Sequence, residues 1–405
     1  MTIPKQQHFI DKELDFGPDN YKPIPVVLSK AKGVWVWDVD NNKYLDMMSA
    51  YSAVSHGHSH PELLKVLHEQ SSRLALTSRA FYTDTLGSFL ETITSLSNFD
   101  MALPMNSGAE AVETAIKAAR RWGYRSKNIK SGKAEIIVAD GNFHGRTTTI
   151  ISFSSSPNSK EDFGPLTPGF ISVEFGSAKA IGEMINENTA AVLIEPIQGE
   201  GGIVVPPENY LPEVRELCTK NNVLMILDEV QSGLGRTGKM FAFEHSNIQP
   251  DGLILGKALG GGFMPVSCFL SSSEVMQWLT PGSHGSTFGG NPLAAAIGKR
   301  ALELLEEENL IENSRVLGEY FKNALIEMKS EIILDVRGKG LWIGVEIDSN
   351  YISGKELFNL LLKKGILSKE THETVIRFAP PLVITKNQID WAINIIKETL
   401  KNISS

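Results

Sequence analysis

The sequence predicts an α/β fold in which helices cover a mostly parallel β-sheet. Short apolar runs alternate with helical patterns through the middle of the 405-residue chain, and such alternation is typical of parallel sheets. Two of the apolar runs are followed closely by a charged residue, Asp228 in one case and Lys257 in the other. Sheets of this kind bind ligands beyond the carboxyl ends of their strands, so these two residues predict the position of a site.

The central elements follow from the apolar periodicity of each segment. The expected strands are 101–104, 135–139, 171–175, 191–194, 223–227 and 253–255, and the expected helices are 109–125, 178–186 and 211–221. Each strand is short and apolar, as in a sheet that is buried on both faces.

The two ends of the chain have a different pattern. Residues 33–46 predict a hairpin with its turn at Asp40-Asn41-Asn42. The C-terminal part predicts helices over 293–308, 311–328 and 388–402 and strands over 332–336, 341–347 and 375–379. We therefore expect a large domain over 51–300 and a smaller α+β domain built from 1–50 and 301–405.

The composition is that of an ordinary globular protein. Hydrophobic residues make up 42% and charged residues 21%, and the net charge of -8 argues against nucleic acid as the main partner. The two cysteines, Cys218 and Cys268, are expected to be reduced and buried. Residues 1–15 lack a signal or transit pattern, and no apolar run reaches membrane-spanning length, so we expect no membrane partner and a cytoplasmic location.

Lys257 and Asp228 together predict a pyridoxal 5′-phosphate (PLP) site. Burial favours the neutral form of a lysine, and a neutral amine is the nucleophile that forms a Schiff base with an aldehyde. A carboxylate such as Asp228 keeps the pyridine nitrogen of PLP protonated, so that the ring accepts electrons. Either residue alone would suggest an ordinary strand end with a solvated charge, whereas the pair favours the site.

Ser107, Gly108 and Ala109 lie at the start of the helix expected over 109–125. Free amides at a helix start bind anions, and glycine lets a phosphate approach closely. The alternative is a plain N-cap serine before an acidic first turn. Lys257 elsewhere in the chain favours the phosphate interpretation.

Phe143 and Arg146 follow the strand expected over 135–139. An aromatic ring there can stack on a cofactor, and an arginine can hold a carboxylate in a bidentate pair. A packed phenylalanine and a surface arginine are an equally good interpretation of these two residues alone.

Three further patterns predict loops. The 233–238 segment matches G-x-G-x-x-G, but no helical periodicity follows it, so we reject dinucleotide binding. Asp38-x-Asp40-x-Asn42 lacks the glycine and glutamate of a calcium loop. His56, His58 and His60 lie in a Gly/Ser loop, where bonds to the backbone are expected. We predict no metal.

Six motifs occur together and in one order along the chain. They are Asn106-Ser107-Gly108-Ala109-Glu110-Ala111, Gly145-Arg146, Glu195-Pro196-Ile197-Gln198-Gly199-Glu200, Asp228-Glu229-Val230-Gln231-Ser232-Gly233, Gly256-Lys257 and His284-Gly285-Ser286-Thr287-Phe288-Gly289-Gly290-Asn291-Pro292. From about residue 33 to the C-terminus, the chain resembles the class-III, PLP-dependent ω-aminotransferases of fold type I. This resemblance implies a seven-stranded sheet in the large domain.

The resemblance also implies a role for each matching residue. Cofactor contacts are implied for Lys257, Ser107, Gly108, Ala109, Phe143, Asp228, Gln231 and, across a homodimer interface, Thr287. Tyr51 and Arg146 would hold the far end of the substrate, Tyr82 would line the pocket, and Glu200 and Arg377 would form a pair that opens and closes. One departure is His144, where animal members tend to carry tryptophan; it leaves the neighbouring residues in register.

Two segments narrow the expected reaction. Residues 78–82 and 376–382 resemble the family members that act on the δ-amine of L-ornithine, and match those acting on acetylornithine or 4-aminobutyrate less well. The implied reaction transfers that amine to 2-oxoglutarate, giving glutamate 5-semialdehyde, which cyclises to pyrroline-5-carboxylate, and glutamate. The alternatives are acetylornithine or another ω-amine as donor, an aminomutase that needs no 2-oxoglutarate, and a non-catalytic binding protein.

Overall fold

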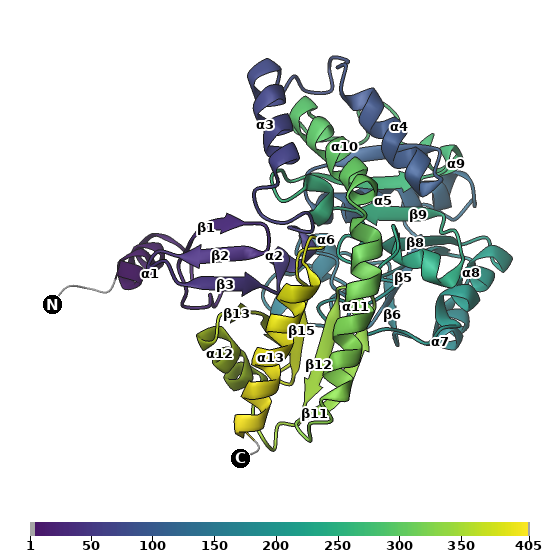
Figure 1. Ribbon diagram of the computed structural model, residues 1–405. Coiled ribbons are helices and arrows are strands. Elements are labelled where there is room, and N and C mark those ends of the chain that lie inside the picture. The colour runs from purple at the N-terminus through teal and green to yellow at the C-terminus, as the bar shows by residue number, and fades with distance from the viewer. Residues whose placement is uncertain (1–4, 404–405) are drawn as a thin grey trace.

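A seven-stranded sheet forms the centre of the computed structural model, which describes residues 5–403 (Figure 1). Its strands are β4 (Met101–Met105), β5 (Glu135–Ala139), β6 (Phe170–Val173), β7 (Thr189–Ile194), β8 (Leu224–Asp228), β9 (Gly252–Leu255) and β10 (Ser267–Ser271), in the order β4-β10-β9-β8-β7-β5-β6. β10 pairs antiparallel with both of its neighbours, and the other pairs are parallel. The expected α/β class and the seven-stranded, mostly parallel sheet are confirmed.

Helices bury both faces of this sheet. Alternate strand residues face opposite ways, so Ile136 and Val138 pack in one cluster with the small residues of α5 (Gly108–Arg125). Ile137 and Ala139 belong to the other cluster, with side chains of α7 (Ala178–Met184) and α8 (Tyr210–Lys220). The polar residues that follow the strands therefore lie at the sheet edge, where loops leave the core.

The C-terminal part adds a second layer of elements. α10 (Pro292–Glu307) packs against α3 (Pro61–Arg73) and α4 (Leu86–Ser97). Beyond it lie the helices α11 (Leu310–Glu327), α12 (Gly354–Lys363) and α13 (Lys386–Ile403). An antiparallel sheet has the order β11 (Ile333–Gly338), β12 (Ile343–Ile347), β15 (Val375–Phe378) and β14 (Lys369–Thr371).

The N-terminal segment forms the projecting sheet at the left of Figure 1. After α1 (Lys5–Phe16) come β1 (Leu28–Lys32), β2 (Trp35–Asp38) and β3 (Lys43–Asp46), and β13 (Ile366–Leu367) pairs with β3 in parallel. The expected hairpin is confirmed, because the Asp38 carboxylate accepts the backbone N–H groups of Asp40 at 2.9 Å and Asn42 at 2.8 Å. Strands from the N-terminal segment and a strand from the C-terminal part thus share one sheet. The limits of the two domains stay a prediction.

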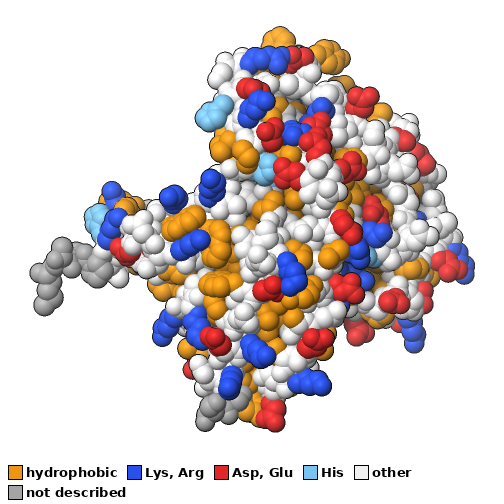
Figure 2. Space-filling view, in the orientation of Figure 1, with side chains coloured by type: hydrophobic (Ala, Val, Ile, Leu, Met, Phe, Trp, Pro, Cys, Tyr) orange, Lys and Arg blue, Asp and Glu red, His pale blue; other side chains and the backbone are white. Residues whose placement is uncertain are grey.

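Short helical turns complete the described chain. They are α2 (Ser49–Ser52), α6 (Thr148–Ile151), α9 (Ser273–Met276) and the 3-10 turns Pro157–Ser159, Ala242–Ser246 and Lys257–Gly260. Acidic and basic side chains are mixed over the face shown in Figure 2. Within residues 5–403 no helix is both long enough and apolar enough to cross a membrane.

Candidate active site

The carboxyl ends of five strands that run in the same direction bring five loops to one edge of the sheet. They enclose a cavity of about 190 Å³. Its lining residues are Gly108, Ala109, Phe143, His144, Gly145, Glu195, Ile197, Glu200, Asp228, Val230, Gln231, Ser232 and Lys257. These loops follow β4, β5, β7, β8 and β9, so the site lies where the fold class predicts a ligand.

Lys257 follows β9 in a strained conformation. Its φ is +45°, a left-handed value that few side-chain-bearing residues adopt. Burial lowers the pKa of its amine, while the carboxylates of Glu200, Asp228 and Glu195 oppose that shift. Strain of this kind persists only where surrounding structure imposes it, and it aims the amine into the cavity rather than along the strand.

Asp228 is the last residue of β8 and is buried. One carboxylate oxygen, Oδ1, accepts the N–H of Val230 at 3.0 Å. The other, Oδ2, lies 2.6 Å from Nδ1 of His144, whose side chain is fully buried. The two partners orient the carboxylate, and its charge stays inside the cavity.

His144 is a site residue to which the sequence assigned no role. Burial opposes protonation of its ring, but the hydrogen bond and charge of Asp228, with the charge of Glu195, outweigh burial and raise the pKa. Its second nitrogen, Nε2, has no partner among the described residues. A histidine two residues before Arg146 gave no signal in the sequence, because its contact with Asp228 spans 84 positions.

Glu195 holds the loop that carries Phe143. Its carboxylate accepts the backbone N–H of Phe143 at 3.0 Å and that of Gly199 at 3.2 Å. Burial raises its pKa to about 7. The motif containing Glu195 was recognised in the sequence, but its function as a link between two loops needed the fold.

The start of α5 lies at another wall of the cavity. Ser107 caps the helix, and its hydroxyl accepts the N–H of Glu110, whose side chain in turn accepts the N–H of Ser107. The amides of the first helical turn are left without partners inside the helix. Gly145 has φ +127°, and a Cβ there would lie 2.8 Å from Cβ of Ala109. Glycine therefore allows the loop after β5 to approach the helix start.

Glu200 and Arg377 form an ion pair at the far side of the cavity. Nη1 of Arg377 lies 3.0 Å from Oε1 of Glu200 and also donates to the carbonyl oxygen of Gly199 at 3.1 Å. Burial opposes ionisation of Glu200, but Arg377 lowers its pKa overall. The Glu200 side chain is 32% exposed and that of Arg377 only 7%. Glu200 therefore has room to move, and Arg377 does not.

Tyr51 reaches this pair from an unusual turn. Ser49, Ala50, Tyr51 and Ser52 all have φ between +43° and +73°, and left-handed backbone costs roughly 1–2 kcal/mol per residue. The guanidinium of Arg377 lies 5.4 Å from the Tyr51 ring centroid, and Nζ of Lys257 lies 6.0 Å from it. The strained turn places an aromatic ring near both the amine and the ion pair.

Arg146 lines a second, wider cavity of about 790 Å³ that shares Phe143 and Glu200 with the first. Its guanidinium lies 5.8 Å from the ring centroids of Phe143 and Tyr21. Tyr82 is fully exposed and lines neither cavity. Its assignment to the pocket stays a prediction.

Ser107 and Thr287 also differ from the other predicted cofactor residues in position. Ser107 lines a neighbouring cavity together with Gly108 and Lys257. Thr287 is exposed and lines neither the 190 Å³ cavity nor the wider one. A single chain therefore does not bring Thr287 to its own site.

The residues present fit PLP well. One cavity combines a buried lysine whose pKa is lowered, a buried carboxylate fixed at the end of a neighbouring strand, and free helix amides suited to a phosphate. Among residues 5–403 no group of three or more His, Cys, Asp or Glu side chains is arranged to hold a metal ion. The lysine, the carboxylate and the helix amides match an organic cofactor with an aldehyde, a basic ring nitrogen and a phosphate.

The class-III aminotransferase family model matches residues 16–400, so the chain belongs to this family of PLP-dependent enzymes. An ornithine aminotransferase of Staphylococcus carnosus is 53% identical over 98% of this chain and 99% of that protein. The ornithine aminotransferase of Bacillus subtilis is 51% identical over 99% of both.

Solved structures give the same family. An ornithine aminotransferase from Toxoplasma gondii, whose active site holds PLP at partial occupancy, is similar with a TM-score of 0.97 and 41% identity, covering 100% of this chain and 96% of that one. An acetylornithine aminotransferase from Elizabethkingia anophelis has a TM-score of 0.89 and 45% identity, covering 99% and 100%.

Proposed function

We propose that this protein transfers the δ-amino group of L-ornithine to 2-oxoglutarate. The products are glutamate 5-semialdehyde, which loses water as it cyclises to pyrroline-5-carboxylate, and glutamate. Curated relatives at 51–53% identity over nearly the whole chain are ornithine aminotransferases. The observation that carries the proposal is the Glu200–Arg377 pair beside Tyr51 and Lys257.

PLP would be held at three sides of the cavity. When bound, it supplies an aldehyde carbon for the amine and a protonated ring that stabilises negative charge on the reacting carbon. Lys257 would hold the aldehyde, and Asp228 would hold the proton on the ring nitrogen. Phe143 would cover the ring face, and Gln231 would bond to the ring hydroxyl. The backbone N–H groups of Gly108 and Ala109 would hold the phosphate, and Ser107 would contact it through its hydroxyl.

Lys257 would also move the proton during catalysis. Burial lowers the pKa of the Lys257 amine, which favours the neutral form that a general base needs. As a neutral amine, Lys257 would accept the proton lost from the δ-carbon of ornithine and later give it back. Its place beyond β9, near the ring of Tyr51, keeps the amine on one side of the cavity.

The Glu200–Arg377 pair would let one pocket accept two unlike substrates. Ornithine must direct its δ-amine to Lys257, and a free Arg377 would instead attract its α-carboxylate there. Glu200 cancels that charge while ornithine reacts. A carboxylate of 2-oxoglutarate can replace Glu200, because a guanidinium holds one carboxylate well in a bidentate pair. Glu200 is the more exposed partner and so is the one that moves.

The far end of ornithine carries an amine and a carboxylate. Arg146 lies in the wider cavity that shares Phe143 with the first, and is placed to pair with that carboxylate. Tyr51 would border the path between the two ends. Tyr82 would line the substrate pocket.

We infer that the active unit is a homodimer in the cytoplasm, with no membrane or nucleic-acid partner. Thr287 is exposed in the single chain, and we assign it to the phosphate of the second copy. A larger assembly would contain the same dimer. The product, pyrroline-5-carboxylate, suits proline biosynthesis and arginine catabolism.

A comparison of amino donors tests the proposal. Ornithine, acetylornithine, 4-aminobutyrate and glutamate 1-semialdehyde are each supplied with and without 2-oxoglutarate. We expect ornithine to react fastest and to need the acceptor for more than one turnover. A preference for acetylornithine would assign the chain to the activity named for the Elizabethkingia structure. Turnover of glutamate 1-semialdehyde without acceptor would instead indicate an aminomutase.

A further inference from the structure

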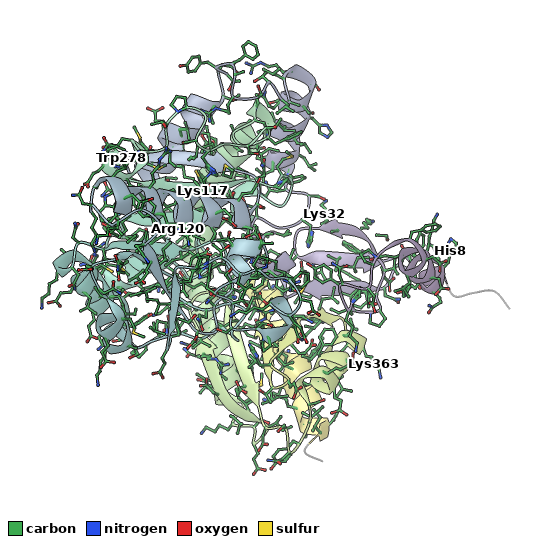
Figure 3. All side chains as sticks on the ribbon, turned by 180° about the vertical axis from the view of Figure 1, so that it is seen from behind. His8, Lys32, Lys117, Arg120, Trp278 and Lys363 are labelled. Atoms are coloured by element: carbon green, nitrogen blue, oxygen red, sulfur yellow. The ribbon has the colours of Figure 1, made fainter. Side chains whose placement is uncertain are left out.

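The loop 283–288 is fastened to α5 of its own chain. Nζ of Lys117 donates to the carbonyl oxygen of Ser283 at 3.1 Å and contacts Nδ1 of His284 at 2.9 Å. The other ring nitrogen, Nε2 of His284, lies 2.7 Å from the hydroxyl oxygen of Thr114. Figure 3 labels Lys117 on the helix, seen from behind.

These contacts fit one arrangement of protons. An ammonium has no lone pair, so Nδ1 of His284 accepts from Lys117, and Nε2–H then donates to the Thr114 oxygen. The Thr114 hydroxyl in turn donates to the carbonyl oxygen of Glu110 at 2.7 Å. Burial and the Lys117 charge lower the pKa of His284, which keeps the ring neutral.

A second fastening joins the same loop to the start of α5. The side-chain amide of Asn106 donates to the hydroxyl oxygen of Ser286 at 2.8 Å and to Oε1 of Glu110 at 3.2 Å. Oε2 of Glu110 also accepts the backbone N–H groups of Asn106 at 2.9 Å and Ser107 at 2.8 Å. Glu110 therefore orders both the helix start that faces the cavity and the residue that holds Ser286.

The two residues that follow Ser286 are exposed to solvent. Thr287 is exposed, and Phe288 is 53% exposed. The chain turns inward again at Gly289, where a Cβ would lie 2.8 Å from the carbonyl oxygen of Pro104. A loop fixed at both ends, with an exposed hydroxyl between them, is suited to a ligand outside its own chain.

We propose that Asn106, Thr114 and Lys117 are positioning residues that hold loop 283–288 for the cofactor phosphate of a second copy of the chain. The inference rests on the homodimer proposed above. The helix α5 would then contribute to two sites. Its first turn would face the phosphate bound by its own chain, and its side chains would hold the loop whose Thr287 contacts the phosphate bound by the second copy. Because preorganisation of a binding group raises affinity, releasing the loop should weaken cofactor binding in the opposite subunit.

Mixed dimers, purified with two affinity tags, separate the two subunits' contributions. In the first dimer one chain carries Lys257→Ala and the other His284→Ala. The only cavity with a lysine then receives an intact loop. In the second dimer one chain carries both substitutions and the other is unaltered, so the only cavity with a lysine receives the altered loop. PLP affinity is measured from the absorbance of lysine-bound cofactor.

We expect the first dimer to bind PLP as tightly as a dimer with Lys257→Ala alone in one chain. The second should bind about tenfold more weakly, as lost hydrogen bonds of this kind would produce. Lys117→Met, at an exposed position, should reproduce the pattern without disturbing the core. Lys127→Met is the matched control, because Lys127 follows the same helix but bonds to the carbonyl oxygens of Thr189 and Asn221.

The opposite pattern, with weak binding in the first dimer and normal binding in the second, would show that the loop serves its own chain and would overturn the proposal. Equal affinities in both dimers would overturn it as well. A chain that stays monomeric during size-exclusion chromatography with PLP would refute the homodimer, while leaving the donor comparison above to decide the reaction.

Discussion

At the scale of single residues, the site is defined by side chains on strained backbone. Lys257 and Tyr51 both have positive φ, at +45° and +57°. Such conformations cost free energy and persist where the surrounding structure imposes them. In this site they bring an amine and an aromatic ring within 6.0 Å of each other, next to the buried Arg377.

Lys257→Ala should abolish multiple turnover, because no other amine lines the cavity enclosed by the described residues. The absorbance of lysine-bound PLP should disappear. The helix start and Asp228 remain, so the variant should still retain PLP without a covalent bond. Spectra before and after dialysis, together with turnover, measure both effects. Substantial multiple turnover by this variant would contradict the assignment.

His144→Phe tests the hydrogen bond between His144 and the carboxylate of Asp228. The substitution keeps a ring but leaves Oδ2 of Asp228 without its donor at 2.6 Å. A hydrogen bond to a charged group contributes roughly 1.5–3 kcal/mol, so we expect kcat to fall about tenfold or more. Asp228→Asn should lose more, since an amide cannot hold the ring proton by charge.

Phe153→Leu is the control for this experiment. Phe153 packs against His144, with the two ring centroids 5.9 Å apart, and its side chain has no hydrogen-bond donor for the carboxylate. A loss of kcat in Phe153→Leu equal to that in His144→Phe would mean that packing, rather than the Asp228 contact, explains the effect.

Glu200→Ala should affect the two halves of the reaction unequally. Without Glu200, the buried Arg377 is free to attract α-carboxylates. We expect the ornithine half-reaction to slow by about tenfold or more, the glutamate half-reaction to be preserved or faster, and α-transamination to increase. Stopped-flow absorbance measures each half separately. Equal losses in both would indicate a salt bridge that never opens.

At the scale of elements, strands were easier to predict than loops. The expected strand 135–139 agrees with β5 residue for residue, and the expected helix 178–186 ends two residues early, at Met184. The helices α3 and α4 were not predicted. Pro61 stands at the first position of α3, where proline is favoured. Leu86, Phe89 and Ile93 form a buried face of α4 at helical spacing. These signals were present in the sequence.

Other features had no local signal. The left-handed turn at Ser49–Ser52 contains no glycine, so nothing in its sequence indicates positive φ. The contact of His144 with Asp228 and that of Glu195 with Phe143 join residues far apart in the chain. Motifs could identify the lysine and the aspartate, whereas the residues that orient them required the packed sheet edge.

The loop before α3 carries a pH-dependent contribution to stability. The ring of His56 is buried, with Nε2 2.8 Å from the carbonyl oxygen of Ala301 in α10. Burial lowers its pKa to about 4, below the ordinary value of about 6.5. The unfolded chain therefore binds more protons between these values, so this stability is present above the ordinary pKa and is lost as pH falls towards 4.

His56→Gln should remove that dependence. From these pKa values, the wild-type chain should lose about 2 kcal/mol more than the variant between pH 7 and pH 5. Urea denaturation at both pH values measures the difference. His68→Gln, at an exposed position of α3, is the control and should leave the slope unchanged. A parallel loss in wild-type protein and His56→Gln would contradict the assignment.

At the scale of the whole molecule, one sheet edge organises the protein. Five loops meet there around the cavity, and Arg377 reaches it from β15 of the second sheet. The exposed Thr287 lies on a loop tied to α5, whose first turn faces the same cavity. In the proposed homodimer, two copies would complete each other's sites, and the Glu200–Arg377 pair would select the orientation of each substrate.

Labelled nitrogen shows directly which amine of ornithine this protein transfers. Ornithine labelled with nitrogen-15 at the δ-amine or at the α-amine is supplied with 2-oxoglutarate, and glutamate is analysed by mass spectrometry. We expect label in glutamate from the δ-labelled donor and none from the α-labelled donor. Label arriving from the α-amine would rule out δ-amino transfer, because it would mean that ornithine binds with its α-carbon at Lys257.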